Sequence, residues 1–172
     1  KTVSGIITPT QTEVIKETGT YACAVSAMFA VSSHYVTLNR LKLSDLYSEL
    51  WRLSGTWEEE EKKYGQATGL YFTQGKTSPD KPAPALMEFC ARRGKELETS
   101  FVWYPSWDSF RVNTDSGNLS IFSGRLRSNG SGHAMAVVGY VAMHNTYSNA
   151  KKYLLVVWNG WTNQLQFLPY DV

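Results

Sequence analysis

Residues 18–31, TGTYACAVSAMFAV, decide the fold of this chain, because they place a cysteine directly before an apolar run without Gly or Pro. A segment that is apolar almost all round is typical of a helix buried in a protein core. We therefore expect a buried helix from about Cys23 to Tyr35. Gly19 and Thr20 supply the preceding turn and an N-cap, so Cys23 is expected in the first turn of this helix.

Cys23 has two alternative roles at that position. The free N–H groups and the positive dipole at a helix start stabilise a thiolate, which makes a cysteine nucleophilic near neutral pH. The alternative is a buried cysteine that packs as a small hydrophobic side chain, as most free cysteines do. This stretch alone leaves both interpretations open, and other segments have to decide between them.

Length and composition argue against several classes of protein. The 172 residues fit one domain with a real core, or two small lobes that share one. The net charge of +2, without a cluster of Lys and Arg, argues against nucleic-acid binding. No apolar run is long enough to span a bilayer and no signal peptide is recognisable, so we expect no membrane contact. The abrupt start at Lys1 suggests a mature fragment or a trimmed chain.

The two cysteines allow one disulfide, but a catalytic Cys23 must remain free. Cys90 lies in the segment ALMEFCA at 85–91, which has an apolar helical pattern, so we expect it to be an inert part of the core. The cysteine content therefore does not determine the redox compartment of the protein.

The first two thirds of the chain read mainly as helices and loops. Residues 1–16 alternate loosely around a proline and are expected to form an extended arm that covers a sheet edge. Apolar residues at helical spacing predict two further helices, and a run of Glu and Lys predicts a solvated segment. The two helices are expected at 41–53, with Ser44 as cap and Gly55 as end, and at 85–93, closed by Gly94. The solvated segment, a helix face or loop, is expected at 57–64. A loop that forms a groove wall is expected at 65–84, and a helical turn at 105–112.

The remaining segments follow strand patterns, several of them rich in Val and Tyr. Strands are expected at 97–104, 119–122, 133–143, 152–158 and 165–168, with a polar loop at 125–132. Helices that come first and antiparallel strands that come last indicate an α+β fold in a single domain, 1–172. We expect a mainly helical lobe at about 17–112 to pack against an antiparallel sheet or half-barrel lobe at about 113–172.

His133 opens the strand pattern GHAMAVVGY at 132–140, directly after a flexible loop. A histidine on a strand is more often structural than catalytic. Here only the small residues Gly132 and Ala134 flank it, which leaves the imidazole accessible while the strand holds its backbone. His144 is an odd number of residues further along, so the two side chains point to opposite faces and cannot both serve one site.

Asn159 lies between Trp158 and Trp161 and beside Gly160, at the end of a buried strand pattern. An asparagine before glycine is common in turns. The functional alternative is an amide that accepts a hydrogen bond from one imidazole nitrogen and directs the other toward the thiol, while an indole keeps water away. A nucleophile, a base and a group that orients the base are the parts that thiol acyl transfer requires.

The segments GHAMAVVG at 132–139 and WNGW at 158–161 closely resemble the staphopain family of secreted bacterial papain-like cysteine peptidases. Residues 16–23 resemble the segment before the nucleophile of that family more loosely. The chain length and the spacings fit as well, with 110 positions from Cys23 to His133 and 26 from His133 to Asn159. The Cys-Gly-Ser-Cys-Trp signature of papain and the cathepsins is absent, and the resemblance does not extend to about 40–115.

This resemblance implies a papain-like fold with the active site in a cleft between the two lobes. It implies that Cys23 is the nucleophile, His133 the general base and acid, Asn159 the orienting amide and Trp161 its shield. It further implies a secreted, monomeric thiol protease (a hydrolase) that needs no cofactor or metal. The partner is then a protein or peptide substrate, and a protein inhibitor is a further expected partner.

Glu17 departs from the pattern of this family, which places a glutamine six residues before the cysteine to help bind the oxyanion. An ionised carboxylate has no proton to donate. A neutral Glu17 donates one, provided that burial and the thiolate raise its pKa. We therefore expect a neutral Glu17 in the oxyanion hole, with Gln11 or Thr20 as alternative donors.

Two other classes of function remain open on the same residues. One is a different thiol acyltransferase, such as a deamidase, a transglutaminase-like enzyme or a toxin effector, whose acceptor is an amine rather than water. The other is an inactive relative that binds peptides without cleaving them, which the carboxylate of Glu17 favours. The sequence does not indicate substrate preference, because the expected pocket walls fall in the segment without a resemblance.

Overall fold

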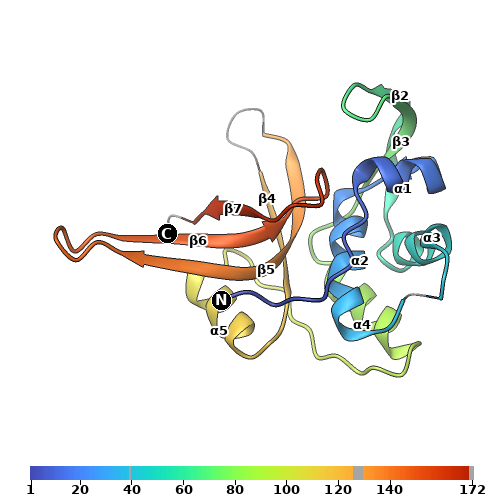
Figure 1. The fold of residues 1–172 in the computed structure, drawn as a ribbon. Helices are drawn as coiled ribbons and strands as arrows, with labels where there is room; N and C mark the ends of the chain where they lie inside the picture. Colours follow the sequence, from blue (N-terminus) through green and yellow to red (C-terminus); the bar gives the residue numbers. More distant parts are fainter. Residues whose placement is uncertain (39, 126–129, 171–172) are drawn as a thin grey trace.

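We describe a computed structural model of the chain, which covers residues 1–38, 40–125 and 130–170. Within this part of the chain the fold is mixed α+β, with five helices and two sheets (Figure 1). In chain order the elements are α1 (Gln11–Thr18), β1 (Thr20–Tyr21), α2 (Cys23–Tyr35), α3 (Leu43–Leu53), β2 (Trp57–Gly65), β3 (Leu70–Lys76), α4 (Pro82–Ala91), α5 (Trp107–Asp115), β4 (Ser120–Arg125), β5 (Gly132–His144), β6 (Lys151–Trp158) and β7 (Gln166–Pro169).

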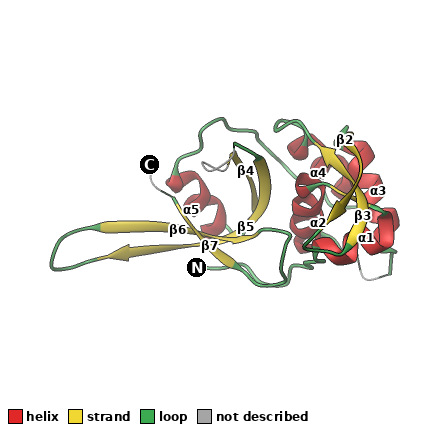
Figure 2. Cartoon of the chain, turned by 90° about the horizontal axis from the view of Figure 1, so that it is seen from above, coloured by secondary structure: helices red, strands yellow, loops and turns green. Residues whose placement is uncertain are grey.

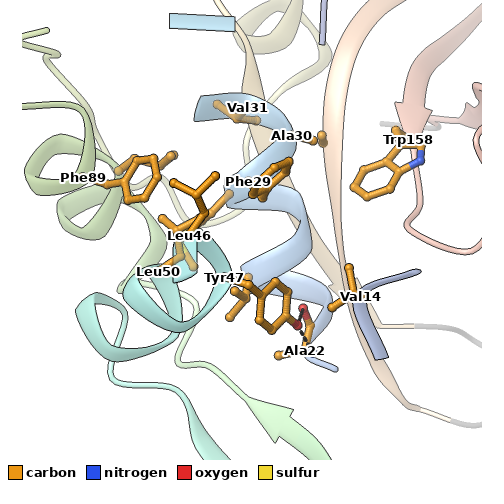
Figure 3. Close-up of a cluster of buried hydrophobic side chains, with 14 of the residues drawn as sticks. Val14, Ala22, Phe29, Ala30, Val31, Leu46, Tyr47, Leu50, Phe89 and Trp158 are labelled. Atoms are coloured by element: carbon orange, nitrogen blue, oxygen red, sulfur yellow. Dashed lines mark hydrogen bonds between the residues drawn. The ribbon is translucent and has the colours of Figure 1, made fainter. Parts of the chain in front are cut away.

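Helix α2 is the centre of the molecule, and its predicted bounds are confirmed. Every residue from Ala24 to Ser32 is buried. The helix packs against α3 and α4 on one side and against β4 and β5 on the other. Figure 3 shows the resulting cluster, in which Phe29 of α2 lies among Leu46, Phe89 and Trp158 from three other elements. Helix α2 can be apolar all round because α3 and α4 cover one side of it and β4 and β5 cover the other.

Helices α1 to α4 and the sheet β1-β3-β2 form one side of the molecule, which we call the helical lobe (Figure 2). Strand β1 is parallel to β3, and β2 is antiparallel to β3. The predictions for 57–64 and 65–84 were therefore wrong, because β2 and β3 lie there. Charged side chains such as Glu58 and Lys62 are exposed on β2, and β2 is an edge strand, where charges prevent pairing with other chains.

Strands β4, β5, β6 and β7 form an antiparallel sheet, which together with α5 makes up the sheet lobe (Figure 2). Alternate residues face opposite sides. Ala136, Val138, Val156 and Trp158 belong to the core around α2, whereas Val137, Leu155 and Val157 form a second cluster with Trp107 and Phe110 of α5. The expected helical turn at 105–112 is thus a helix that covers the outer face of the sheet, so the expected boundary at 112 cuts through it.

Most of the predicted elements near the core are confirmed, with small shifts of their ends. The helices at 41–53 and 85–93 correspond to α3 and α4, and Lys42 rather than Ser44 is the N-cap of α3. The strands at 119–122, 133–143, 152–158 and 165–168 correspond to β4 to β7. Residues 97–104 form no strand. The expected polar loop at 125–132 includes 126–129, which lie outside the described residues.

The N-terminal arm follows β5 beyond the end of β4, as expected for a segment that covers an edge. Val3 N donates to Val138 O at 2.7 Å, and Tyr140 N donates to Lys1 O at 2.9 Å. The arm is shorter than the expected 1–16, because α1 begins at Gln11. A capping box causes this, since the Thr10 side chain accepts from Glu13 N and the Glu13 carboxylate accepts from Thr10 N.

Candidate active site

Cys23 is the first residue of α2, at the seam between the two lobes. Its half-buried Sγ accepts a hydrogen bond of 3.4 Å from the backbone N–H of Ala134 on β5. Burial raises the pKa of the thiol above its ordinary value, although the N–H groups of Ala134, Ala24 and Cys23 act in the opposite direction. Burial thus opposes the thiolate that the helix start favours.

The backbone before Cys23 is held by Tyr47 of α3. The Tyr47 hydroxyl accepts from Ala22 N at 2.5 Å and donates to Ala22 O at 3.2 Å, a pairing that Figure 3 shows. Ala22 is the N-cap of α2 and has no side chain that could cap the helix, and the expected cap Thr20 lies in β1 instead. Tyr47 thus supplies hydrogen-bond partners for the N–H and C=O of Ala22, which would otherwise have to bond to water. This contact fixes the position of Cys23 relative to α3.

His133 is the second residue of β5, at the other side of this seam. Its Nε2 lies 2.8 Å from the backbone carbonyl oxygen of Asn159. Since a carbonyl can only accept, Nε2 must carry the proton, and Nδ1 then has a free lone pair in the neutral ring. Burial lowers the pKa of His133, and the bond to Asn159 partly offsets this effect. The resting site therefore combines a neutral imidazole with a thiol.

Asn159 orients His133 with its backbone, which differs from the orienting amide that the sequence predicts. Its side-chain Oδ1 accepts from Trp161 N at 2.9 Å, and its Nδ2 donates to Gln166 Oε1 at 2.8 Å. The amide thus shapes the turn at 159–161 and attaches it to β7. The backbone of this turn presents the carbonyl oxygen of Asn159 to Nε2 of His133.

Trp161 lies beside His133, where a shielding indole was expected. The two ring centroids are 6.1 Å apart with an interplanar angle of 33°, and the indole is 48% exposed. Trp161 also meets the ring of Tyr21, at 6.0 Å between centroids. The indole therefore contacts both the imidazole of the sheet lobe and an aromatic ring of the helical lobe.

Glu17 is exposed on α1, so the burial that a neutral Glu17 requires is missing. Among the alternative donors, Gln11 lies closer to the turn, because its backbone N donates to Gly160 O at 2.8 Å and its side chain is buried. Thr20 Oγ1 donates to Thr18 Oγ1 at 3.3 Å. The remaining candidate is the backbone N–H of Cys23 itself, at the start of α2.

The other two histidines and the second cysteine lie elsewhere. His34 Nε2 lies 3.1 Å from Gly117 O, and His144 Nε2 lies 2.7 Å from Asn149 Oδ1 in the protruding β5–β6 hairpin. Cys90 is fully buried in α4. Over the described ranges no three His, Cys, Asp or Glu residues are placed to hold a metal ion, and no helix is long and apolar enough to cross a membrane.

Sequence reasoning did not identify Tyr21, Tyr47 and Gln166 as parts of this site. Their roles are carried by single hydroxyl, ring or amide contacts, and their sequence patterns indicate only helix or strand. The structure brings Cys23 and the first residues of β5 together and places Asn159 and Trp161 around His133. Comparison with protein-family models, with curated proteins and with solved structures finds no match to this chain.

Proposed function

We propose that this chain is a cysteine peptidase that hydrolyses peptide bonds through Cys23, His133 and Asn159. One observation carries the proposal: the Sγ of Cys23 is hydrogen-bonded to the backbone N–H of the residue that follows His133. The bond of Nε2 to Asn159 O leaves Nδ1, the ring nitrogen nearer the backbone, to accept the thiol proton. These two bonds support the assignment of Cys23 as nucleophile and His133 as base at the same seam.

In the first half of the reaction, Nδ1 of His133 takes the proton of the Cys23 thiol as Sγ attacks the peptide carbonyl carbon. The carbonyl π bond opens, and its electrons move to the oxygen. When the tetrahedral intermediate collapses, the C–N bond breaks and the imidazolium gives its proton to the leaving amine. The product is a thioester on Cys23 and a free amine.

In the second half, a water molecule replaces the amine. Nδ1 of His133 removes a proton from this water as its oxygen attacks the thioester carbon. The C–S bond then breaks, a carboxylic acid leaves, and the proton on His133 returns to Sγ. The neutral resting pair is restored, which agrees with the raised pKa of Cys23 and the lowered pKa of His133.

The oxyanion that forms in both halves requires hydrogen-bond donors that are already in place. The backbone N–H of Cys23 is one such donor, because it lies at the start of α2 among the N–H groups without an intrahelical partner. A second donor must come from the helical lobe before Cys23. Gln11 is the preferred candidate, since its backbone is bonded to the turn that holds His133.

The finer fold assignment is part of the same proposal. We infer a papain-like arrangement, with the substrate cleft between the helical lobe and the sheet lobe. Support comes from the position of Cys23 at the start of the central helix, from the antiparallel sheet that carries His133, and from the staphopain-like segments at 132–139 and 158–161. Secretion and action on protein or peptide substrates follow from this resemblance.

A second candidate function is that of an inactive peptide-binding relative. The raised pKa of Cys23 favours it, because a thiol is a weaker nucleophile than a thiolate. Labelling with an epoxide inhibitor of papain-like peptidases, followed by mass mapping, separates the two candidates. The peptidase predicts modification at Cys23 and none at Cys90, and loss of labelling in His133→Ala. Labelling that is equally slow at both cysteines contradicts the peptidase and supports the inactive relative.

A further inference from the structure

The turn at Asn159, Gly160 and Trp161 holds the imidazole of His133, and it is itself held from the helical lobe. The carbonyl oxygen of Gly160 accepts from Gln11 N at 2.8 Å, at the start of α1. The ring of Trp161 packs against the ring of Tyr21, at 6.0 Å between centroids. The turn of one lobe is therefore positioned by residues of the other.

The hydroxyl of Tyr21 lies next to Gly160 of this turn. Gly160 has φ +82°, and a Cβ built on it would overlap the hydroxyl oxygen of Tyr21, while Tyr21 Cζ would lie at 3.6 Å. The hydroxyl therefore occupies the space that any side chain at position 160 would need. The 3.6 Å separation from Tyr21 Cζ is an ordinary carbon contact, so the hydroxyl oxygen alone excludes a Cβ at position 160.

The Tyr21 hydroxyl is buried and lies against Gly160 of the turn. Burial also raises the pKa of Tyr21 well above its ordinary value, which keeps the hydroxyl protonated and uncharged. Tyr21 is thus neither an acid, a base nor an oxyanion donor for a substrate. Its hydroxyl meets the site at Gly160, so the turn is the route by which we expect it to act on His133.

We infer that Tyr21 is a positioning residue for His133. Its hydroxyl fixes Gly160, and the adjacent Asn159 carbonyl fixes the Nε2–H tautomer and the ring orientation of His133. This inference rests on the proposed function, because it assigns Tyr21 a part in that reaction. A displacement of the turn by about 1 Å moves the carbonyl out of hydrogen-bond range, and misplacement of this size costs on the order of 10²-fold in rate.

The test uses four variants of the full chain: Gly160→Ala, Tyr21→Phe, the double variant, and Gly117→Ala. Gly117 has φ +81° with open space around its Cα, so it matches the backbone strain of Gly160→Ala without the overlap. We expect Gly160→Ala to slow casein hydrolysis by about 10²-fold and Tyr21→Phe severalfold. The double variant should recover about tenfold relative to Gly160→Ala, since only an ordinary contact with Cζ remains. Gly117→Ala should keep its rate.

The thermal midpoint and the tautomer of His133, read from imidazole nitrogen-15 shifts, are measured on the same proteins. We expect the Nε2–H tautomer in the wild type, a mixture in Gly160→Ala, and its return in the double variant. The inference is overturned if the double variant is as slow as Gly160→Ala with the same tautomer mixture, or if Gly160→Ala behaves as Gly117→Ala does. If the wild type cleaves nothing, the proposed function fails, while the tautomer series still decides the role of Tyr21.

Discussion

The two cysteines of this chain lie in comparable helices but in opposite surroundings. Cys23 is the first residue of α2, and Cys90 is the next-to-last residue of α4. Both helices are apolar and share one core. Cys23 is half-buried and receives an N–H from β5, whereas Cys90 is fully buried near the carbonyl end of its helix. The position of a cysteine along a helix, rather than the helix itself, thus determines what its sulfur can do.

The electrostatics of the two thiols follow the same contrast. Burial raises the pKa of Cys90 to about 11, although Arg93 and Lys95 act to lower it. Burial also raises the pKa of Cys23, but backbone N–H groups at the helix start oppose this effect directly at the sulfur. Of the two, Cys23 alone combines partial exposure with an N–H donor from the strand that carries His133. Four predictions, ordered by the size of their effect, test this contrast.

Removal of the two sulfurs should have opposite consequences. Cys23→Ala should lower the rate of peptide hydrolysis by on the order of 10⁴ to 10⁶, the range for loss of a catalytic nucleophile, and should leave the thermal midpoint nearly unchanged. Cys90→Ala should keep the rate and cost about 1–2 kcal/mol of unfolding free energy, because it leaves a small cavity in the core. Hydrolysis assays and denaturant titrations of both variants measure this. Loss of activity in Cys90→Ala at unchanged stability would contradict the assignment.

Replacement of His133 and replacement of Asn159, whose carbonyl bonds Nε2 of His133, should have effects of different size. His133→Ala removes the base and should slow hydrolysis by about 10²- to 10⁴-fold. Asn159→Ala keeps the backbone carbonyl that bonds Nε2 and removes only the two side-chain bonds of the turn, so we expect a loss of about tenfold. Steady-state kinetics of both variants measure the difference. A loss in Asn159→Ala equal to that in His133→Ala would show that the side chain, not the carbonyl, orients the imidazole.

The pH dependence of alkylation should separate a thiol from a preformed ion pair. The pKa of Cys23 is raised and that of His133 is lowered, so both shifts favour the uncharged thiol and imidazole over an ion pair. The rate of iodoacetamide reaction at Cys23 should rise about tenfold per pH unit through neutral pH, as its thiolate fraction does. Cys90 should react at least about tenfold more slowly at each pH, because it is buried with a pKa of about 11. A flat profile at Cys23 across neutral pH would contradict the neutral pair.

The smallest effect is expected at Glu17. Because its side chain is exposed on α1, Glu17→Gln and Glu17→Ala should stay within about twofold of the wild type in pH–rate profiles. Gln11→Ala is the comparison variant, since Gln11 is the preferred side-chain donor for the oxyanion. A clear shift of activity toward neutral pH in Glu17→Gln alone would restore Glu17 to the oxyanion hole.

The sequence predicts the centre of the fold well, because its signals there are dominated by burial. The apolar run after Cys23 has no alternative to a buried helix, and the pattern from His133 onward has the length and composition of a central strand. The wrong predictions fall where side chains face water, at a sheet edge or at the start of a surface helix. The Glu and Lys run of β2 resembles a solvated loop, and Pro9 masks the capping box of Thr10 and Glu13 within a segment that reads as extended.

The residues of the candidate site likewise differ in how well the sequence predicts their roles. Cys23, His133 and Trp161 are recognisable because their chemistry lies in the side chain. The role of Asn159 was assigned to its amide, whereas its carbonyl holds His133, and every residue type has a carbonyl. Tyr21 and Gly160 are about 140 residues apart in sequence, so their contact depends on the packing of the two lobes. Backbone roles and contacts between lobes leave no pattern in the residue order.

Hydrolysis of casein in oxygen-18 water by the wild type and by Cys23→Ala, with the products read by mass spectrometry, tests the central claim most directly. The account predicts new peptides whose terminal carboxylates carry one oxygen-18 atom, present with the wild type and absent with Cys23→Ala. Cleavage that persists in Cys23→Ala, or intact casein after long incubation with the wild type, would contradict it. Intact chains with glutamine converted to glutamate would instead identify a deamidase on the same residues.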